Sequence, residues 1–233
     1  MSAHPLEQLR FLARSWDADE ELPMTEVAAV LDQLATESPG SLLQACRRLI
    51  EYFPAAGPVW WLSARVLSAA DPAEAVWQAA DELSEDPTGR MFADALPPSV
   101  TVGLPGHSRA VALALRRRPD VTVEKKPGRA DLVVVTALAG GPADLLVSAR
   151  AEAAIGHAVK SGKPVWALVA RGVLLPQGLW EQLLLRVQAS GGCGVLSART
   201  FSAGVSDSGK GAIDAVLSGP TCPAVAELLG WKS

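Results

Sequence analysis

The sequence contains few of the residues that usually form disulfides or metal sites. Its 233 residues include three cysteines and three histidines: Cys46, Cys193, Cys222, His4, His107 and His157. The cysteines are odd in number and widely spaced, which argues against a disulfide framework or a Cys-x-x-Cys metal site. The histidines share no metal-ligand spacing. We therefore expect no metal and no cofactor, and we interpret the cysteines as structural.

The sequence also lacks long apolar runs and an excess of positive charge. Its apolar runs fall far short of the ~20 residues that cross a membrane. Residues 1–16 lack the basic-then-apolar order of a signal peptide. A formal net charge of −4 does not suggest a nucleic-acid-binding domain, which is usually basic. We expect a cytoplasmic protein that binds neither membranes nor nucleic acid.

Hydrophobic residues make up 49% of the chain, enough for a sizeable core, and the clearest pattern lies in residues 130–176. The apolar runs 132–135 and 165–170 lack the alternation of half-exposed strands, as expected for strands covered on both faces. Residues 148–160 carry apolar side chains at helical spacing. This pattern predicts a strand, a polar loop, a helix and a second strand, forming a right-handed β-α-β crossover.

The chain divides into two predicted parts. Residues 1–96 predict a helical section only, and residues 97–233 predict a Rossmann-like α/β domain with a mostly parallel sheet and flanking helices. The expected N-terminal helices are 5–15, 25–35 with Thr25 as N-cap, 41–52, 59–69, 72–83 with Asp71 as N-cap, and 87–96. Trp60, Trp61 and Trp77 predict a cluster between packed helices, with ligand stacking as the alternative.

The second part begins with predicted strands at 100–103 and 121–124 around a helix at 108–117. A helix at 177–187 returns to the sheet. Residues 190–211 are rich in glycine and serine and predict a mobile or irregular loop. The tail contains a short predicted helix that would clamp onto the domain or onto a partner subunit through Val225, Leu228, Leu229 and Trp231.

The first candidate site is the glycine turn that follows the strand at 100–103. Gly103 and Gly106 lead into a helix whose free backbone N–H groups suit a phosphate or carboxylate. His107, Ser108 and Arg109 would add polar contacts. The spacing matches neither a dinucleotide-binding nor a P-loop motif. The alternative is an ordinary strand-to-helix turn in which Ser108 caps the helix.

The second candidate site follows the strand at 132–135, because ligands of open α/β sheets bind outside the carboxyl ends of strands. It comprises Thr136, Asp144, Ser148 and Arg150. Asp144 is either an acid or base, or the cap of the following helix. Arg150 is either a ligand contact or a solvated helix charge.

Six lysines and arginines lie in residues 115–129 without interleaved aromatic residues. A solvated strip at a helix C-terminus explains them, since cations are favoured there. Contact with RNA or phosphate is the alternative.

Residues 91–229 resemble the initiation factor 2B alpha/beta/delta-like family, which includes methylthioribose-1-phosphate isomerase and ribose-1,5-bisphosphate isomerase. The likeness rests on a helical N-terminal part, the opening VTVGLPGHSRAVALAL, the strand ADLVVV, the segment ARAEAAIGHAVKSGKPVWALV and the tail PTCPAVAELL. It implies the same Rossmann-like fold.

The sequence departs from the isomerases at the positions that carry their chemistry. Their turn Thr-x-Cys-Asn-x-Gly supplies a catalytic cysteine, where this chain has GLPGHS. Their Gly-Ala-Asp motif supplies a catalytic aspartate, where this chain has Thr136-Ala137-Leu138. LVSAR replaces their Asn-Lys-x-Gly-Thr, and the eight residues between Val123 and Leu132 leave no room for a β-α unit. The resemblance therefore implies the fold without the isomerase reaction.

These observations predict a non-catalytic binding or regulatory protein related to initiation factor 2B. We expect a homodimer, formed through sheet-edge or C-terminal contacts, that retains a pocket for a phosphorylated sugar or nucleotide. The alternative is an isomerase-like or phosphate-ester enzyme with altered residues, using Asp144 as base and Arg109 or Arg150 on phosphate. A translation-associated protein that uses residues 116–129 to contact a factor or RNA is a third hypothesis.

Overall fold

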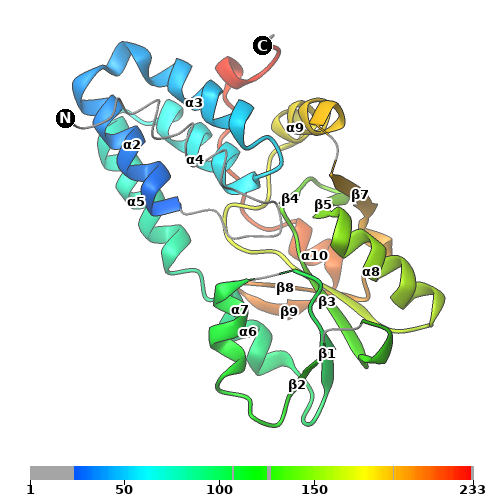
Figure 1. Ribbon diagram of the computed structural model, residues 1–233. Coiled ribbons are helices and arrows are strands. Elements are labelled where there is room, and N and C mark those ends of the chain that lie inside the picture. Colours follow the sequence, from blue (N-terminus) through cyan, green and yellow to red (C-terminus); the bar gives the residue numbers. More distant parts are fainter. Residues whose placement is uncertain (1–23, 107, 125–126, 191, 232–233) are drawn as a thin grey trace.

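The computed structural model describes residues 24–106, 108–124, 127–190 and 192–231 (Figure 1). Its first part is helical, as predicted. The helices are α2 (Met24–Glu37), α3 (Leu42–Tyr52), α4 (Gly57–Ser68), α5 (Pro72–Ser84) and α6 (Thr88–Ala95). The predicted helix at 5–15 lies outside the described residues. None of the described helices is long and apolar enough to cross a membrane.

Two of the predicted local features of this section are confirmed and two are wrong. Asp71 caps α5, because its carboxylate accepts a hydrogen bond from the Glu74 N–H at 3.1 Å. Trp60 and Trp61 are buried as predicted. Trp77, however, is 43% exposed on α5 and does not join their cluster. Thr25 lies inside α2 and not at its cap, since the helix already includes Met24.

The second part contains a six-stranded sheet in the order β2-β1-β3-β6-β8-β9. The strands are β1 (Thr101–Gly103), β2 (Thr122–Glu124), β3 (Leu132–Thr136), β6 (Val165–Leu168), β8 (Ala203–Ser206) and β9 (Gly209–Gly211). All neighbours are parallel except β8 and β9. The predicted mostly parallel α/β sheet is thus confirmed, including the pairing of β3 with β6. Between β2 and β3 the described residues hold only the short 3₁₀ helix η2 (Pro127–Arg129).

Helices cover both faces of this sheet. On one face, Val102, Val134 and Trp166 pack with Phe92 of α6 and Val111 of α7 (Arg109–Leu115). On the other face, Val133, Val135 and Ala167 pack with residues of α8 (Ala149–Lys160) and α10 (Ile213–Leu217). Both faces of β3 and β6 are therefore buried, which explains the absence of polar alternation in their sequences.

A small antiparallel sheet was missed from the sequence. It has the order β4-β5-β7, with β4 (Ala139–Gly140), β5 (Asp144–Ser148) and β7 (Cys193–Ser197). The polar loop predicted before α8 was therefore wrong, since it contains β4 and β5. The irregular loop predicted at 190–211 was also wrong, because β7, β8 and β9 occupy most of it.

The tail packs onto its own chain, against both the helical section and α9 (Gln177–Ser190), through Val225, Leu228 and Trp231. Leu229, which the prediction also placed in this contact, is 39% exposed. The tail follows α9 and α10 and includes the 3₁₀ helix η4 (Ala226–Leu228). The Trp231 ring lies 6.0 Å from the Trp60 ring and 3.8 Å from the Arg186 guanidinium. Leu228 is fully buried in the core that joins α2–α4, α9 and the tail. The division of the chain at residue 96 stays a prediction.

Candidate functional site

The strand order places a topological switch point at the carboxyl ends of β1 and β3, because β1 leads to its neighbour β2 on one side and β3 leads toward β6 on the other. After β1 the chain passes through α7 on one face, and after β3 it continues toward α8 on the other face. Ligands of open α/β sheets bind where neighbouring strands diverge in this way. Gly103 ends β1 and Thr136 ends β3, so the two predicted sites begin on adjacent strands.

The turn after β1 has the form of an ordinary strand-to-helix turn. The Ser108 hydroxyl caps α7 by accepting a hydrogen bond from the Val111 N–H at 3.3 Å. A side chain at Gly106 would meet open space. His107 lies outside the described residues, and Arg109 is the first residue of α7. Ligand binding at this turn stays a prediction.

The second predicted group is divided between two sheets. Thr136 is exposed at the end of β3. Asp144 begins β5 opposite Ser197 of β7, so the prediction that it caps a helix was wrong. The cap of α8 is instead the buried Ser148, whose hydroxyl accepts from the Ala151 N–H at 3.3 Å. Arg150 is exposed on the first turn of α8.

The first turn of α4 packs against the segment that follows β3. The Gly57 N–H donates to the Leu138 carbonyl oxygen at 2.8 Å, and Ala137 is buried beside it. A Cβ atom at Gly57 would lie 2.8 Å from the same oxygen. The position that follows β3 is thus filled by apolar side chains and by the chain's own helix.

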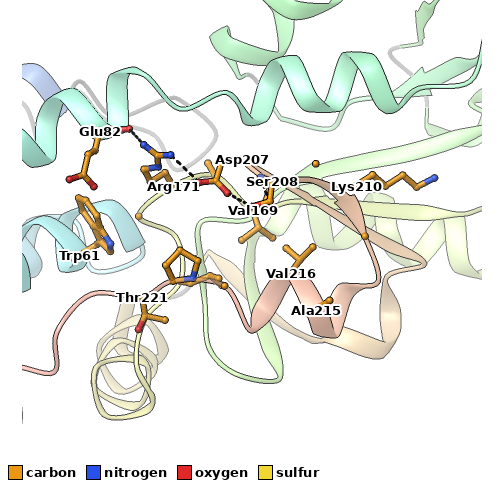
Figure 2. Close-up of a pocket in the computed structure, with 18 of the residues that line it drawn as sticks. Trp61, Glu82, Val169, Arg171, Asp207, Ser208, Lys210, Ala215, Val216 and Thr221 are labelled. Atoms are coloured by element: carbon orange, nitrogen blue, oxygen red, sulfur yellow. Dashed lines mark hydrogen bonds and ion pairs between the residues drawn. The ribbon is translucent and has the colours of Figure 1, made fainter.

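An open cleft of about 520 Å³ lies at the carboxyl ends of the next strands, β6 and β8 (Figure 2). Its walls come from α4, α5, the loop after β6, the β8–β9 turn, α10 and the start of the tail. The polar or aromatic side chains that line it belong to Trp61, Arg65, Glu82, Arg171, Ser206, Asp207, Ser208, Lys210 and Thr221. None of the site residues predicted from the sequence lines this cleft.

Arg171 is held by two segments that line the cleft, residues 82–86 and the β8–β9 turn. Its Nη2 donates to Asp207 Oδ2 at 3.0 Å, and its Nη1 donates to the Glu82 carbonyl oxygen at 3.2 Å. Its backbone N–H donates to Asp86 Oδ2 at 3.1 Å. The hydrogen bond to Asp207 raises the pKa of Arg171 above its ordinary value. The guanidinium therefore stays charged and ties the sheet to the helical section.

A second ion pair lies on the helical wall. Arg65 Nη1 and Nη2 donate to the two carboxylate oxygens of Glu82, each at 2.8 Å. The Arg65 guanidinium also lies 4.7 Å from the centre of the Trp61 ring. Across the cleft, the Lys210 ammonium lies 3.8 Å from the centre of the Trp166 ring. Both cations are therefore held by neighbouring side chains.

Four of the lining charges form the two ion pairs, and Lys210 is the fifth charge. The described residues contain no group of three acidic, histidine or cysteine side chains arranged to hold a metal ion. Sequence reasoning missed the cleft because β8 was not recognised. The rule that ligands bind beyond strand ends would otherwise have pointed to Ser206 and Asp207.

One arginine of the basic segment 115–129, Arg118, makes structural contacts with the end of α6. The Arg118 guanidinium donates to the carbonyl oxygens of Ala93, Leu96 and Pro97 at the end of α6, and it pairs with Asp120 at 2.8 Å. Arg118 thus satisfies carbonyl groups that a helix end leaves without intrahelical donors.

No protein-family model and no curated protein matches the sequence. Several solved structures match the fold. The eIF2B-beta2-delta2 complex of C. thermophilum matches with a TM-score of 0.70 and 16% identity, over 92% of this chain and 93% of that chain. Translation initiation factor eIF-2B of Pyrococcus horikoshii OT3 matches with a TM-score of 0.72 and 11% identity, over 94% of this chain and 100% of that chain.

An enzyme also matches. The 5-methylthioribose 1-phosphate isomerase of Pyrococcus horikoshii OT3 aligns with a TM-score of 0.57 and 12% identity, over 88% of this chain and 83% of that chain. At these identities the likeness concerns the fold. The chain therefore has the fold shared by eIF2B subunits and methylthioribose-1-phosphate isomerase, as its sequence resemblance implied.

Proposed function

We propose that this chain is a non-catalytic binding or regulatory protein related to initiation factor 2B. The observation that carries the proposal lies at the end of β3. The resemblance places the catalytic aspartate of the isomerases there, and this chain has Thr136-Ala137-Leu138. Ala137 is buried and the Leu138 carbonyl binds the Gly57 N–H, so this segment serves the packing of α4.

A phosphorylated small molecule is the proposed ligand of the turn that follows β1, next to the end of β3. Backbone N–H groups of the glycine turn and the exposed Thr136 hydroxyl support this choice. The ligand would report on a sugar-phosphate or nucleotide concentration without being converted. We also propose that the protein acts in the cytoplasm as a homodimer. Because the tail is packed onto its own chain, the exposed sheet edges are better candidates than the tail for dimer contacts.

An activity assay tests the proposal directly. The purified chain is incubated with 5-methylthioribose 1-phosphate and with ribose 1,5-bisphosphate, and products are followed by NMR beside an active isomerase. We expect no product. Turnover that is lost in Ser108→Ala or Asp144→Asn would favour the alternative, an isomerase-like enzyme with altered catalytic residues.

Binding and assembly are measured separately. Thermal shift with sugar phosphates and nucleotides should show stabilisation that Arg109→Ala removes. Light scattering during gel filtration should give the mass of two chains. Stabilisation without turnover supports a binding protein, and a monomer at all accessible concentrations contradicts the homodimer.

A further inference from the structure

The Arg171–Asp207 pair presents hydrogen-bond donors and acceptors side by side in the cleft. A guanidinium has five N–H donors, and among the described residues Arg171 uses one on Asp207 and one on the Glu82 carbonyl. Asp207 accepts from Arg171 and from the Ser208 hydroxyl at 3.1 Å. A carboxylate offers about four acceptor positions. Donors and acceptors thus remain on adjacent groups, which Figure 2 shows pointing toward each other.

The charges of the cleft are almost balanced. Arg171 is paired with Asp207, and Arg65 is paired with Glu82 through two hydrogen bonds. Lys210 is the remaining charged lining residue, and its side chain points away from the Arg171–Asp207 pair in Figure 2. A phosphate placed on Arg171 would lie beside the Asp207 carboxylate, so attraction and repulsion would nearly cancel. The cleft therefore favours a ligand without net charge.

A pair of neighbouring hydroxyl groups matches this arrangement. Each hydroxyl both donates and accepts, so one can accept from Arg171 while the next donates to Asp207. Val169 and Val216 supply an apolar wall for the ligand's carbon atoms. The volume of about 520 Å³ is within the usual range for small-molecule sites.

We propose that the cleft between β6, β8 and the helical section binds a neutral polyhydroxylated molecule, of the size of a monosaccharide, through a vicinal diol held by Arg171 and Asp207. This site is distinct from the turn after β1, where the proposed ligand is phosphorylated.

The test compares neutral and phosphorylated forms of the same sugars. Ribose, glucose, galactose, mannose and inositol, and the phosphates of each, are titrated into the full chain by calorimetry and thermal shift. We expect at least one neutral member to bind, and Asp207→Asn to weaken it by at least tenfold. Because that variant leaves Arg171 without its carboxylate, it should also bind the corresponding phosphate more tightly than the wild type does.

Asp214→Asn is the matched control. It removes the same charge from an exposed position on α10 that does not line the cleft, so both affinities should stay within twofold of the wild type. Circular dichroism and the melting temperature verify that Asp207→Asn is folded; if it is not, Arg171→Gln is titrated in its place, with the same loss of neutral binding expected. Failure of every neutral sugar to bind, or binding that Asp207→Asn and Arg171→Gln leave unchanged, overturns the proposal. Isomerase turnover in the activity assay would contradict the non-catalytic function, but it would not bear on whether neutral sugars bind at Arg171 and Asp207.

Discussion

The backbone N–H of Gly57 donates a hydrogen bond to the carbonyl oxygen of Leu138 over 2.8 Å. This bond joins the first residue of α4 to the segment that follows β3. The Val173 carbonyl, after β6, approaches the same point, since a Cβ atom at Gly57 would lie 2.9 Å from it. Gly57 therefore packs the helical section directly against the backbone that follows β3 and β6, and this close contact leaves no room for a side chain.

Gly57→Ala should destabilise the fold by about 1–3 kcal/mol, because the added methyl group would force two backbone carbonyls apart. Gly156→Ala is the control, since its Cβ would meet open space on α8. There the substitution should stabilise by roughly 0.5–1 kcal/mol, the usual gain of alanine over glycine in a helix. Urea unfolding of both variants measures the two free energies. Equal effects would contradict close packing at Gly57.

Glycine also explains where sequence reasoning failed. The segment 190–211 and the segment between β3 and α8 were predicted as loops, yet they hold β4, β5, β7, β8 and β9. A Cβ at Gly194 would lie 2.4 Å from the Glu152 carboxylate, and one at Gly204 would lie 3.0 Å from Val216. These glycines allow a helix to approach a strand closely. A single sequence cannot distinguish this role from that of a turn.

Long apolar segments were predictable because both faces of their strands are buried. The runs at β3 and β6, and the helical patterns of α3, α5 and α8, gave the order of the fold correctly. The cleft depends on contacts between distant segments instead. Arg171 joins Glu82, Asp86 and Asp207, and nothing in the local sequence around any of them indicates that partnership.

Trp231→Ala should destabilise the chain by roughly 2 kcal/mol or more, because it removes a large ring packed against Trp60 and the Arg186 guanidinium. The tail should then exchange its amide hydrogens faster, which hydrogen exchange with mass spectrometry would detect over residues 219–231. Trp77→Ala removes the same side chain from a site that is 43% exposed, and it should cost much less. Unchanged exchange in the tail would show that Trp231 does not anchor it.

Cys46 and Cys222 should resist thiol reagents in the native protein. Both are buried, and burial raises the pKa of each thiol to about 12, so almost no reactive thiolate exists at about pH 8. Cys193 is partly exposed. Titration with Ellman's reagent should therefore modify one cysteine rapidly and the other two only after unfolding. Cys193→Ser should abolish the rapid reaction, and its persistence would contradict the burial of the other two thiols.

Asp120 should make stability depend on pH in the acid range. The Arg118 guanidinium, through its hydrogen bonds, and then the Ser99 N–H hold the pKa of Asp120 well below its usual value of 3.8. A carboxyl group whose pKa is lower in the folded state adds stability above its unfolded pKa. That stability is lost as the pH falls through the folded pKa.

Asp120→Asn should therefore be less stable than the wild type near neutral pH, and the difference should shrink steadily below about pH 4. Urea unfolding between about pH 3 and pH 7 measures this difference, with Asp214→Asn as the charge-matched control. A difference that stays constant over this range would mean that the Asp120 carboxylate does not contribute through its charge.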